Sequence, residues 1–135
     1  MRALVILESF TALTAVIGGA LFIGRPDGAL LGADPALLSG TPFSDWQLPG
    51  LLLALMGVGF AFVAVWQQLR GRGANALAAV AGIGLIAFEV VEFAMIGFHP
   101  LQAVYAVVGL AIIVIAISSS ASRGSAREPR PARQR

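Results

Sequence analysis

Four long apolar stretches constrain this chain more than any other feature. Each contains roughly 18 to 24 residues, enough for a helix to cross a hydrocarbon core of about 30 Å. They lie at about residues 3–24, 50–69, 74–97 and 101–119. Only 12% of the 135 residues are charged, against about 25% in a typical soluble domain. The sequence therefore predicts an all-α, polytopic membrane protein.

The apolar stretches predict helices rather than the strands of a membrane barrel. Runs such as LLLALMGVGFAFVAV (residues 51–65) lack the strict alternation of barrel strands. A tight turn, RGRG at residues 70–73, joins the second and third spans, and Gly97 with Pro100 marks the next turn. Such short connections force neighbouring helices to run antiparallel. We expect a four-transmembrane-helix antiparallel bundle at residues 1–119.

Two segments lie outside the predicted spans. Residues 120–135 are rich in Ser, Arg and Pro without an apolar period, which predicts a disordered basic tail. The connection at residues 25–48 is too apolar to float in water, so we expect it to lie on the bundle mouth or in the headgroup layer. Its large apolar residues are Leu30, Leu31, Leu37, Leu38, Phe43 and Trp46.

The arginines predict the orientation, because cytoplasmic segments near helix ends are enriched in basic residues. Arg25 alone would lie outside, so both termini are expected to be cytoplasmic. Lysine is absent, which fits a GC-rich bacterial genome and a bacterial plasma (inner) membrane. The tail lacks aromatic residues for base stacking, so we expect it to meet anionic lipid headgroups and not nucleic acid. The predicted cytoplasmic arginines are Arg2, Arg70, Arg72, Arg123, Arg127, Arg130, Arg133 and Arg135.

Small residues at four-residue spacing predict close helix packing. The pairs are Ala15 with Gly19, Gly57 with Ala61, and Ala78 with Gly82. The segments MGVGF and AGIGL look alike, but nothing flanking them extends the match, and we infer no internal repeat.

Three carboxylates lie within the predicted spans, where a charge costs at least about 2.5 to 3.5 kcal/mol. At 1.5 Å per residue, Glu8 lies roughly 8 Å to the cytoplasmic side of its span's centre. Glu89 and Glu92 lie roughly 5 and 10 Å to the outer side of theirs. Glu8 therefore does not join the other two. On the cytoplasmic side we expect it to pair with Arg70 or with a glutamine such as Gln67.

The third span presents Glu89, Glu92 and His99 on nearly one face, which continues backward as Leu85, Gly82, Ala78 and Asn75. We expect this face to point into the bundle. Neighbouring spans add further polar groups at the same outer depth. The predicted outward-facing pocket contains Arg25, Glu89, Glu92, His99, Gln102 and Tyr105.

The spacing of these residues argues against catalysis. The Glu-x-x-His motif of carboxylate-bundle metal sites is missing, and although three zinc ligands remain geometrically possible, we predict no metal and no cofactor. No nucleophile has a base beside it, and cysteine is absent. We expect no enzyme.

The chain resembles a family of small bacterial four-span integral membrane proteins that has no activity to transfer. The resemblance rests on GGALFIGRPDGALLG, TPFSDWQLPGLLL, the double-Arg turn and IGFHPLQAVY, and it covers about residues 15–110. It implies the four-span architecture. It also implies that the position of Glu92 is often Gln.

Three functions are left open. The first is a non-enzymatic subunit or helper of a membrane complex, or a binder of a lipophilic ligand at the outer pocket. The second is a small proton- or cation-coupled transporter using Glu89 and Glu92, because two close carboxyls in hydrocarbon are expected to share a proton. The third is an enzyme acting on a lipid-borne substrate. Four short spans bury little among themselves, so we also expect a homo-oligomer or a larger complex.

Overall fold

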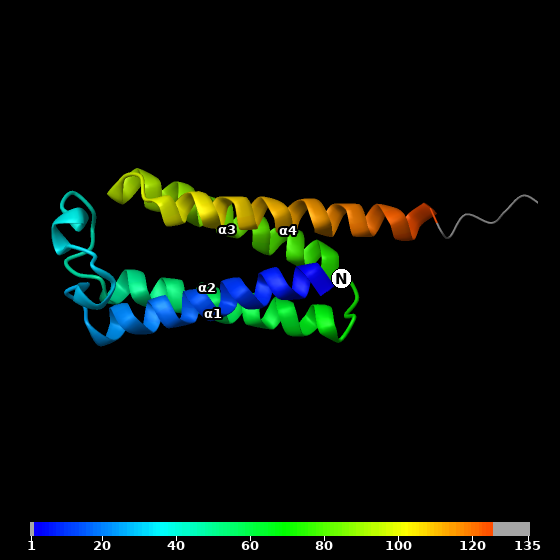
Figure 1. The fold of residues 1–135 in the computed structure, drawn as a ribbon, viewed down its shortest axis with the longest axis horizontal. Helices are drawn as coiled ribbons and strands as arrows, with labels where there is room; N and C mark the ends of the chain where they lie inside the picture. The colour runs from blue at the N-terminus through cyan, green and yellow to red at the C-terminus, as the bar shows by residue number, and fades with distance from the viewer. Residues whose placement is uncertain (1, 126–135) are drawn as a thin grey trace, which may run out of the picture.

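The computed structural model describes residues 2–125 as four long helices and two short 3-10 helices (Figure 1). The long helices are α1 (Arg2–Gly24), α2 (Gln47–Gln68), α3 (Ala74–Ile96) and α4 (Pro100–Ser125), and the short ones are η1 (Ala29–Leu31) and η2 (Pro35–Leu38). Each long helix is long and apolar enough to span a membrane. The predicted all-helical class and the four apolar helices are confirmed.

The start of α2 differs from the prediction. The helix begins at Gln47 and not at residue 50. The Asp45 carboxylate accepts a hydrogen bond from the Gln47 amide at 2.9 Å, which satisfies one of the donors that lack an intrahelical partner. Pro49 then lies within the first turn, where its missing N–H is not needed.

The end of α4 also differs from the prediction, because the helix continues to Ser125 instead of stopping at residue 119. The hydroxyls of Ser118, Ser120 and Ser122 each donate to the carbonyl four residues earlier. Since these groups are satisfied within the helix, the loss of apolar character after residue 117 does not end it. The predicted disorder is therefore wrong for residues 120–125, and residues 126–135 lie outside the described part of the chain.

The helices form two antiparallel pairs. α1 packs mainly on α2 and α3 on α4, with fewer contacts between the pairs (Figure 1). Glycines allow each pair to approach closely. A Cβ at Gly19 would lie 2.5 Å from the Gly50 carbonyl oxygen, and one at Gly82 would lie 2.8 Å from the Gly109 carbonyl oxygen.

Two of the three predicted small-residue pairs are confirmed as packing positions, because Ala15, Gly19, Ala78 and Gly82 are all buried. The prediction that Gly57 and Ala61 form a packing pair is wrong, since Ala61 is exposed. The contact face of α2 instead repeats every seven residues. Its buried small residues are Gly50, Gly57 and Ala64.

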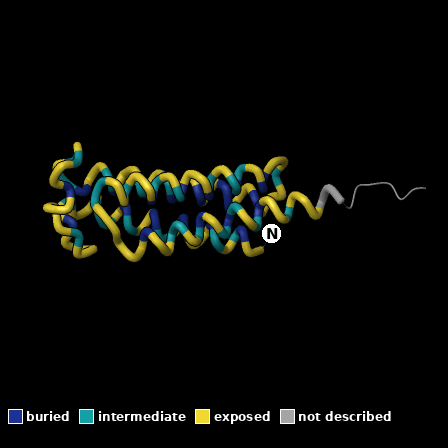
Figure 2. Tube along the Cα trace, turned by 90° about the horizontal axis from the view of Figure 1, so that it is seen from above, coloured by how far each residue is buried: buried dark blue, intermediate teal, exposed yellow. Residues whose placement is uncertain are grey.

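Buried residues lie along the inside of the bundle, and exposed residues lie along its outside (Figure 2). This distribution fits helices whose outer faces meet lipid, where an exposed apolar side chain carries no penalty. The core is a single cluster of Leu4, Ala12, Phe60, Val63, Ala78, Leu85, Ile112 and Ala116.

The connection between α1 and α2 is held partly on the bundle. The Trp46 ring stacks on Phe22 with centroids 4.8 Å apart, and Leu38 is buried. Leu30 and Leu37 are exposed. Residues 25–46 thus lie over one end of the bundle with part of their apolar surface uncovered.

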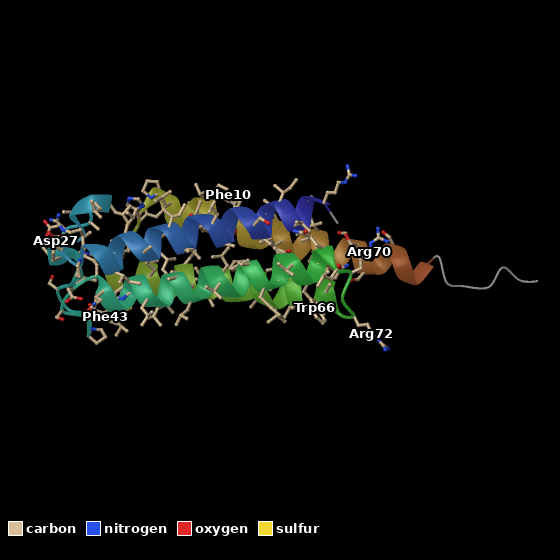
Figure 3. All side chains as sticks on the ribbon, turned by 90° about the horizontal axis from the view of Figure 1, so that it is seen from below. Phe10, Asp27, Phe43, Trp66, Arg70 and Arg72 are labelled. Atoms are coloured by element: carbon tan, nitrogen blue, oxygen red, sulfur yellow. The ribbon has the colours of Figure 1, made fainter. Side chains whose placement is uncertain are left out.

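We call the end of the bundle that carries residues 25–46 and the α3–α4 turn the loop end. We call the opposite end, where α1 begins and the α2–α3 turn lies, the terminal end. Figure 3 shows Asp27 and Phe43 at the loop end, and Trp66, Arg70 and Arg72 at the terminal end.

Candidate functional site

A pocket of about 200 Å³ opens between α3 and α4 toward the loop end. Two polar residues line it, Glu89 and Gln102. All its other lining residues are apolar, and they are Ile86, Val90, Phe93, Phe98, Ala103 and Ala106.

Glu89 reaches this pocket from the buried face of α3. The predicted inward face is confirmed from Asn75 to Glu89, because Asn75, Ala78, Gly82, Leu85 and Glu89 are buried, together with Ala74. Its outer part is wrong, since Glu92 is half-buried and His99 is exposed. Glu89 is only 6% exposed, and its Oε2 has no hydrogen-bond partner. A buried carboxyl oxygen without a partner leaves hydrogen-bonding capacity unused.

Gln102 is held in place by the turn before α4. Its side-chain amide donates to the Gly97 carbonyl at 3.1 Å, and its Oε1 accepts from the His99 backbone amide at 2.9 Å. Gly97 has a φ of +79°, which a glycine adopts easily. Gln102 is therefore a fixed part of the pocket wall.

His99 caps α4 and does not line the pocket. Its exposed ring accepts a hydrogen bond at Nδ1 from the Leu101 amide at 3.3 Å. Pro100 then follows as the first residue of the helix, a position that suits its missing N–H. The prediction that His99 forms the pocket rim is wrong for its side chain, because the ring satisfies the helix start.

Glu92 and Tyr105 lie beside the pocket and not in its wall. The carboxyl groups of Glu89 and Glu92 lie close enough to interact electrostatically, and so do Glu92 and His99. Tyr105 packs against the hydrophobic core cluster.

Arg25 does not reach Glu89 or Glu92. Its guanidinium donates to the Asp27 carboxylate at 2.8 Å, and both side chains are about half exposed, at 55% and 52%. The hydrogen bond from Arg25 lowers the pKa of Asp27, as does the hydrogen bond from the Ala29 amide. The Arg25 guanidinium binds a carboxylate two residues along the chain. Arg25 is therefore absent from the predicted six-residue pocket.

The predicted polar pair at the other end does not form. Both carboxyl oxygens of Glu8 are buried without a hydrogen-bond partner. The Gln67 side-chain amide donates instead to the Ala74 carbonyl at 3.1 Å, and Arg70 is exposed. Arg70 belongs to the turn and not to the helix interior, so its side chain points to the surface.

Glu8 and Glu89 occupy different depths, as predicted. The contacts of Gly19 and Gly57 show which residues of α1 and α2 lie at the same level along the bundle, and they place Glu8 opposite Val63. The Gln67–Ala74 hydrogen bond aligns α2 with α3 in the same way, so Glu8 lies near the level of Ala78. Glu89 is 89 − 78 = 11 residues further along α3, which is about 16 Å along the helix axis. The two carboxyls cannot act on one ligand atom.

The pocket is an apolar slot, and the buried carboxyl of Glu89 and the amide of Gln102 lie behind its wall. Within residues 2–125, no group of three His, Cys, Asp or Glu is placed to hold a metal ion. Sequence reasoning missed the apolar wall, chiefly Phe93 and Phe98. The spacing of Phe93 from Glu89 on α3 could have indicated part of this wall, since residues three or four apart share a helix face. Phe98 lies in the turn before α4 and gives no such signal.

The chain has the architecture of a multi-pass membrane protein, and a buried carboxyl lies beside an apolar pocket between α3 and α4. No protein-family model matches the chain, and no curated protein or solved structure matches it either. Its function must therefore be inferred from its own residues.

Proposed function

We propose that this protein is a non-enzymatic membrane protein that binds a lipophilic ligand in the pocket between α3 and α4. One observation carries the proposal: the pocket surface is apolar, and directly behind it lies Glu89, which is 6% exposed with one oxygen unpartnered. Ligand sites commonly combine an apolar lining with a few fixed polar groups that orient the ligand.

The hydrogen bonds that Glu89 and Gln102 already make indicate which chemical groups the ligand's polar head would carry. The Gln102 oxygen already accepts from His99, and one of its two amide hydrogens is donated to Gly97. The buried acceptor without a partner is the Glu89 Oε2, and an ionised carboxyl only accepts hydrogen bonds. A ligand with an amine or hydroxyl head on an apolar chain matches this acceptor, whereas a carboxylate head has no hydrogen to donate to it.

The proposed setting is a bacterial plasma membrane, with both termini cytoplasmic and the loop end outside. The arginine distribution supports it, since Arg70 and Arg72 lie at the end where α1 begins (Figure 3). The ligand would then enter from the outer half of the bilayer. A complex with further copies or another membrane protein is compatible with the pocket, as is contact of the arginine-rich tail with anionic headgroups.

Photoactivatable amphiphiles of equal chain length test the pocket directly. A fatty amine and a fatty alcohol carrying a diazirine should cross-link to the protein in lipid nanodiscs more strongly than the matching fatty acid. Glu89→Gln should reduce labelling by the amine to about the level of the alcohol, because it removes the charge and keeps the shape. The measurement is the labelled fraction by intact-protein mass spectrometry.

Glu92→Gln is the matched control, because Glu92 lies three residues away on the same helix and does not line the pocket. It should leave the preference for the amine in place, because glutamine keeps a polar contact with Glu89 and the Glu89 carboxyl itself is unchanged. Equal labelling by amine, alcohol and acid, or an equal loss in the two variants, would refute the assignment of Glu89.

The proposed orientation has its own test, helped by the absence of cysteine from the chain. Ser44→Cys in the exposed connection should react with a membrane-impermeant maleimide in intact cells. Arg72→Cys, in the turn at the opposite end, should react only after the membrane is permeabilised. The reverse pattern would invert the topology, while leaving the helices and the pocket unchanged.

A second function, proton- or cation-coupled transport, is favoured by the closeness of the Glu89 and Glu92 carboxyls, which interact electrostatically. Such a pair can release a proton when a cation enters. Leu85 and Phe60 fill the core between the level of Glu89 and that of Glu8, so a transport path would need the two helix pairs to move apart. Flux in proteoliposomes that is unchanged by Glu89→Gln would remove this alternative.

A further inference from the structure

A second pocket, of about 300 Å³, lies at the terminal end, about one bundle length from the first. It is formed by the α2–α3 turn, the first turn of α3 and the side of α4. Its polar and turn residues include Gln67, Arg70, Gly73, Asn75 and Ser120. The proposed ligand site uses none of them.

Arg70 reaches this pocket from a backbone conformation that a non-glycine residue rarely adopts. Its φ is +53°. The Arg70 amide donates to the Gln67 carbonyl at 3.1 Å and the Gly71 amide to the Trp66 carbonyl at 3.0 Å. This is the pattern that ends many helices with a glycine at the position of Arg70. A left-handed backbone is unfavourable for a residue with a Cβ, so the presence of arginine instead of glycine at this position indicates a role for its side chain.

The start of α3 also faces the pocket and lacks a cap. The N-cap residue is Gly73, which has no side chain to accept a hydrogen bond. The backbone amides of Ala74 and Leu77 donate to carbonyls of the turn. Asn75 and Ala76, which lie between them in the first turn of α3, line the pocket. Backbone amides at the start of a helix of 23 residues attract anions, and the helix dipole adds to the attraction.

Two deeply buried side chains bring acceptors to the same pocket. Gln67 is 1% exposed and Asn75 is 7% exposed. Their amide groups already donate, Gln67 to the Ala74 carbonyl and Asn75 to the Ala116 carbonyl and Ser120 hydroxyl. Their oxygens, Oε1 and Oδ1, have no partner. These oxygens point to a ligand that carries a hydrogen-bond donor, which an anion alone does not supply.

We propose that this pocket binds the headgroup of a phospholipid in which an ammonium or hydroxyl donor follows the phosphate. The phosphate would meet the Arg70 guanidinium and the amides of Asn75 and Ala76, and the donor would meet Gln67 and Asn75. The surroundings indicate a lipid, because Leu69 is 72% exposed and Trp66 is 37% exposed beside the turn. Tryptophan favours the level of the headgroups.

The test compares three lipids with identical acyl chains, which distinguishes recognition of the donor from recognition of the phosphate. They are phosphatidylethanolamine, phosphatidylglycerol and phosphatidylcholine. Each is titrated onto delipidated protein in neutral detergent, and bound lipid is counted by native mass spectrometry. The first two should bind about tenfold or more tightly than phosphatidylcholine, whose headgroup has a phosphate but no donor, as expected for a lost hydrogen bond to a buried acceptor.

Arg70→Gly and Arg72→Gly form a matched pair, because both remove one positive charge from the same turn. Figure 3 shows the two side chains leaving that turn in different directions. Arg70→Gly should weaken the binding of all three lipids, because each carries the phosphate, without lowering thermal stability, since glycine relieves the positive φ. Arg72→Gly should leave the affinities unchanged, because Arg72 does not line the pocket.

Equal binding of the three lipids, or an equal loss of lipid affinity in the two variants, would overturn the proposal. Either result would indicate only a general electrostatic attraction between the protein and phospholipids. Binding of inorganic phosphate or glycerol phosphate as tightly as the whole lipid would also overturn it, because the site would then recognise a free anion. Neither result bears on the pocket at the loop end, whose test uses amphiphiles without phosphate.

Discussion

Gly57→Ala should destabilise the bundle, and Gly59→Ala in the same helix should stabilise it. A Cβ at Gly57 would lie 2.8 Å from the Val16 amide nitrogen and 2.9 Å from the Ala12 carbonyl oxygen. Backbone atoms cannot rotate away, so α1 and α2 must separate. The expected loss is about 1–3 kcal/mol, as for other overpacked sites. The measurement is unfolding by SDS in mixed micelles.

Gly59 is the control, because a Cβ there meets nothing within 4 Å. Alanine at that position should gain up to about 1 kcal/mol from its higher helix propensity. The same contrast is expected in α3, where Gly82 contacts the Gly109 carbonyl and Gly84 contacts nothing. Equal effects at Gly57 and Gly59 would contradict the packing of α1 on α2.

Glu8→Met should stabilise the bundle, whereas Gly57→Ala should destabilise it. Glu8 is fully buried within an apolar helix, and neither of its carboxyl oxygens has a partner. Replacing a buried charged group by an apolar side chain of similar volume is often stabilising. The expected gain is about 1–3 kcal/mol, bounded by the cost of a charge at the centre of a membrane helix. Thermal unfolding in detergent would measure it.

Gln68→Met is the control for Glu8→Met, because Gln68 is exposed at the same end of the bundle. It should change stability by less than about 0.5 kcal/mol, the usual range for surface substitutions. A loss of stability in Glu8→Met would show instead that the carboxyl has a favourable interaction in the native membrane.

The helices and the inward face of α3 could be predicted because both follow from periodicity. Apolar length predicts the four helices, and a helix repeat places Glu89 on the same buried stripe as Leu85 and Gly82. The separation of Glu8 from Glu89 also follows from counting residues along the axis. These inferences need only the geometry of one helix at a time.

The composition of the pocket could not be predicted because it depends on local competition for hydrogen bonds. Arg25 binds Asp27, and the His99 ring binds the Leu101 amide, so neither is free to enter the pocket. Both partners lie two residues away in sequence, and depth along the membrane does not reveal them. The choice between Gly57 and Gly59 likewise depends on the rotation of α2, which a pattern of small residues leaves open.

The extent of α4 was missed for a related reason. A drop in hydropathy predicts where a helix leaves the membrane, but it does not predict where the helix ends. Serines that bond their own helix allow it to continue past that point.

The position of the photoactivated fatty amine on the wild-type chain tests the central claim most directly. Digestion and mass spectrometry of the cross-linked protein should place the label within residues 86–106, on the walls of the pocket between α3 and α4. A label spread over the exposed faces of α1 and α2 would show ordinary lipid contact, and it would contradict a ligand site at Glu89.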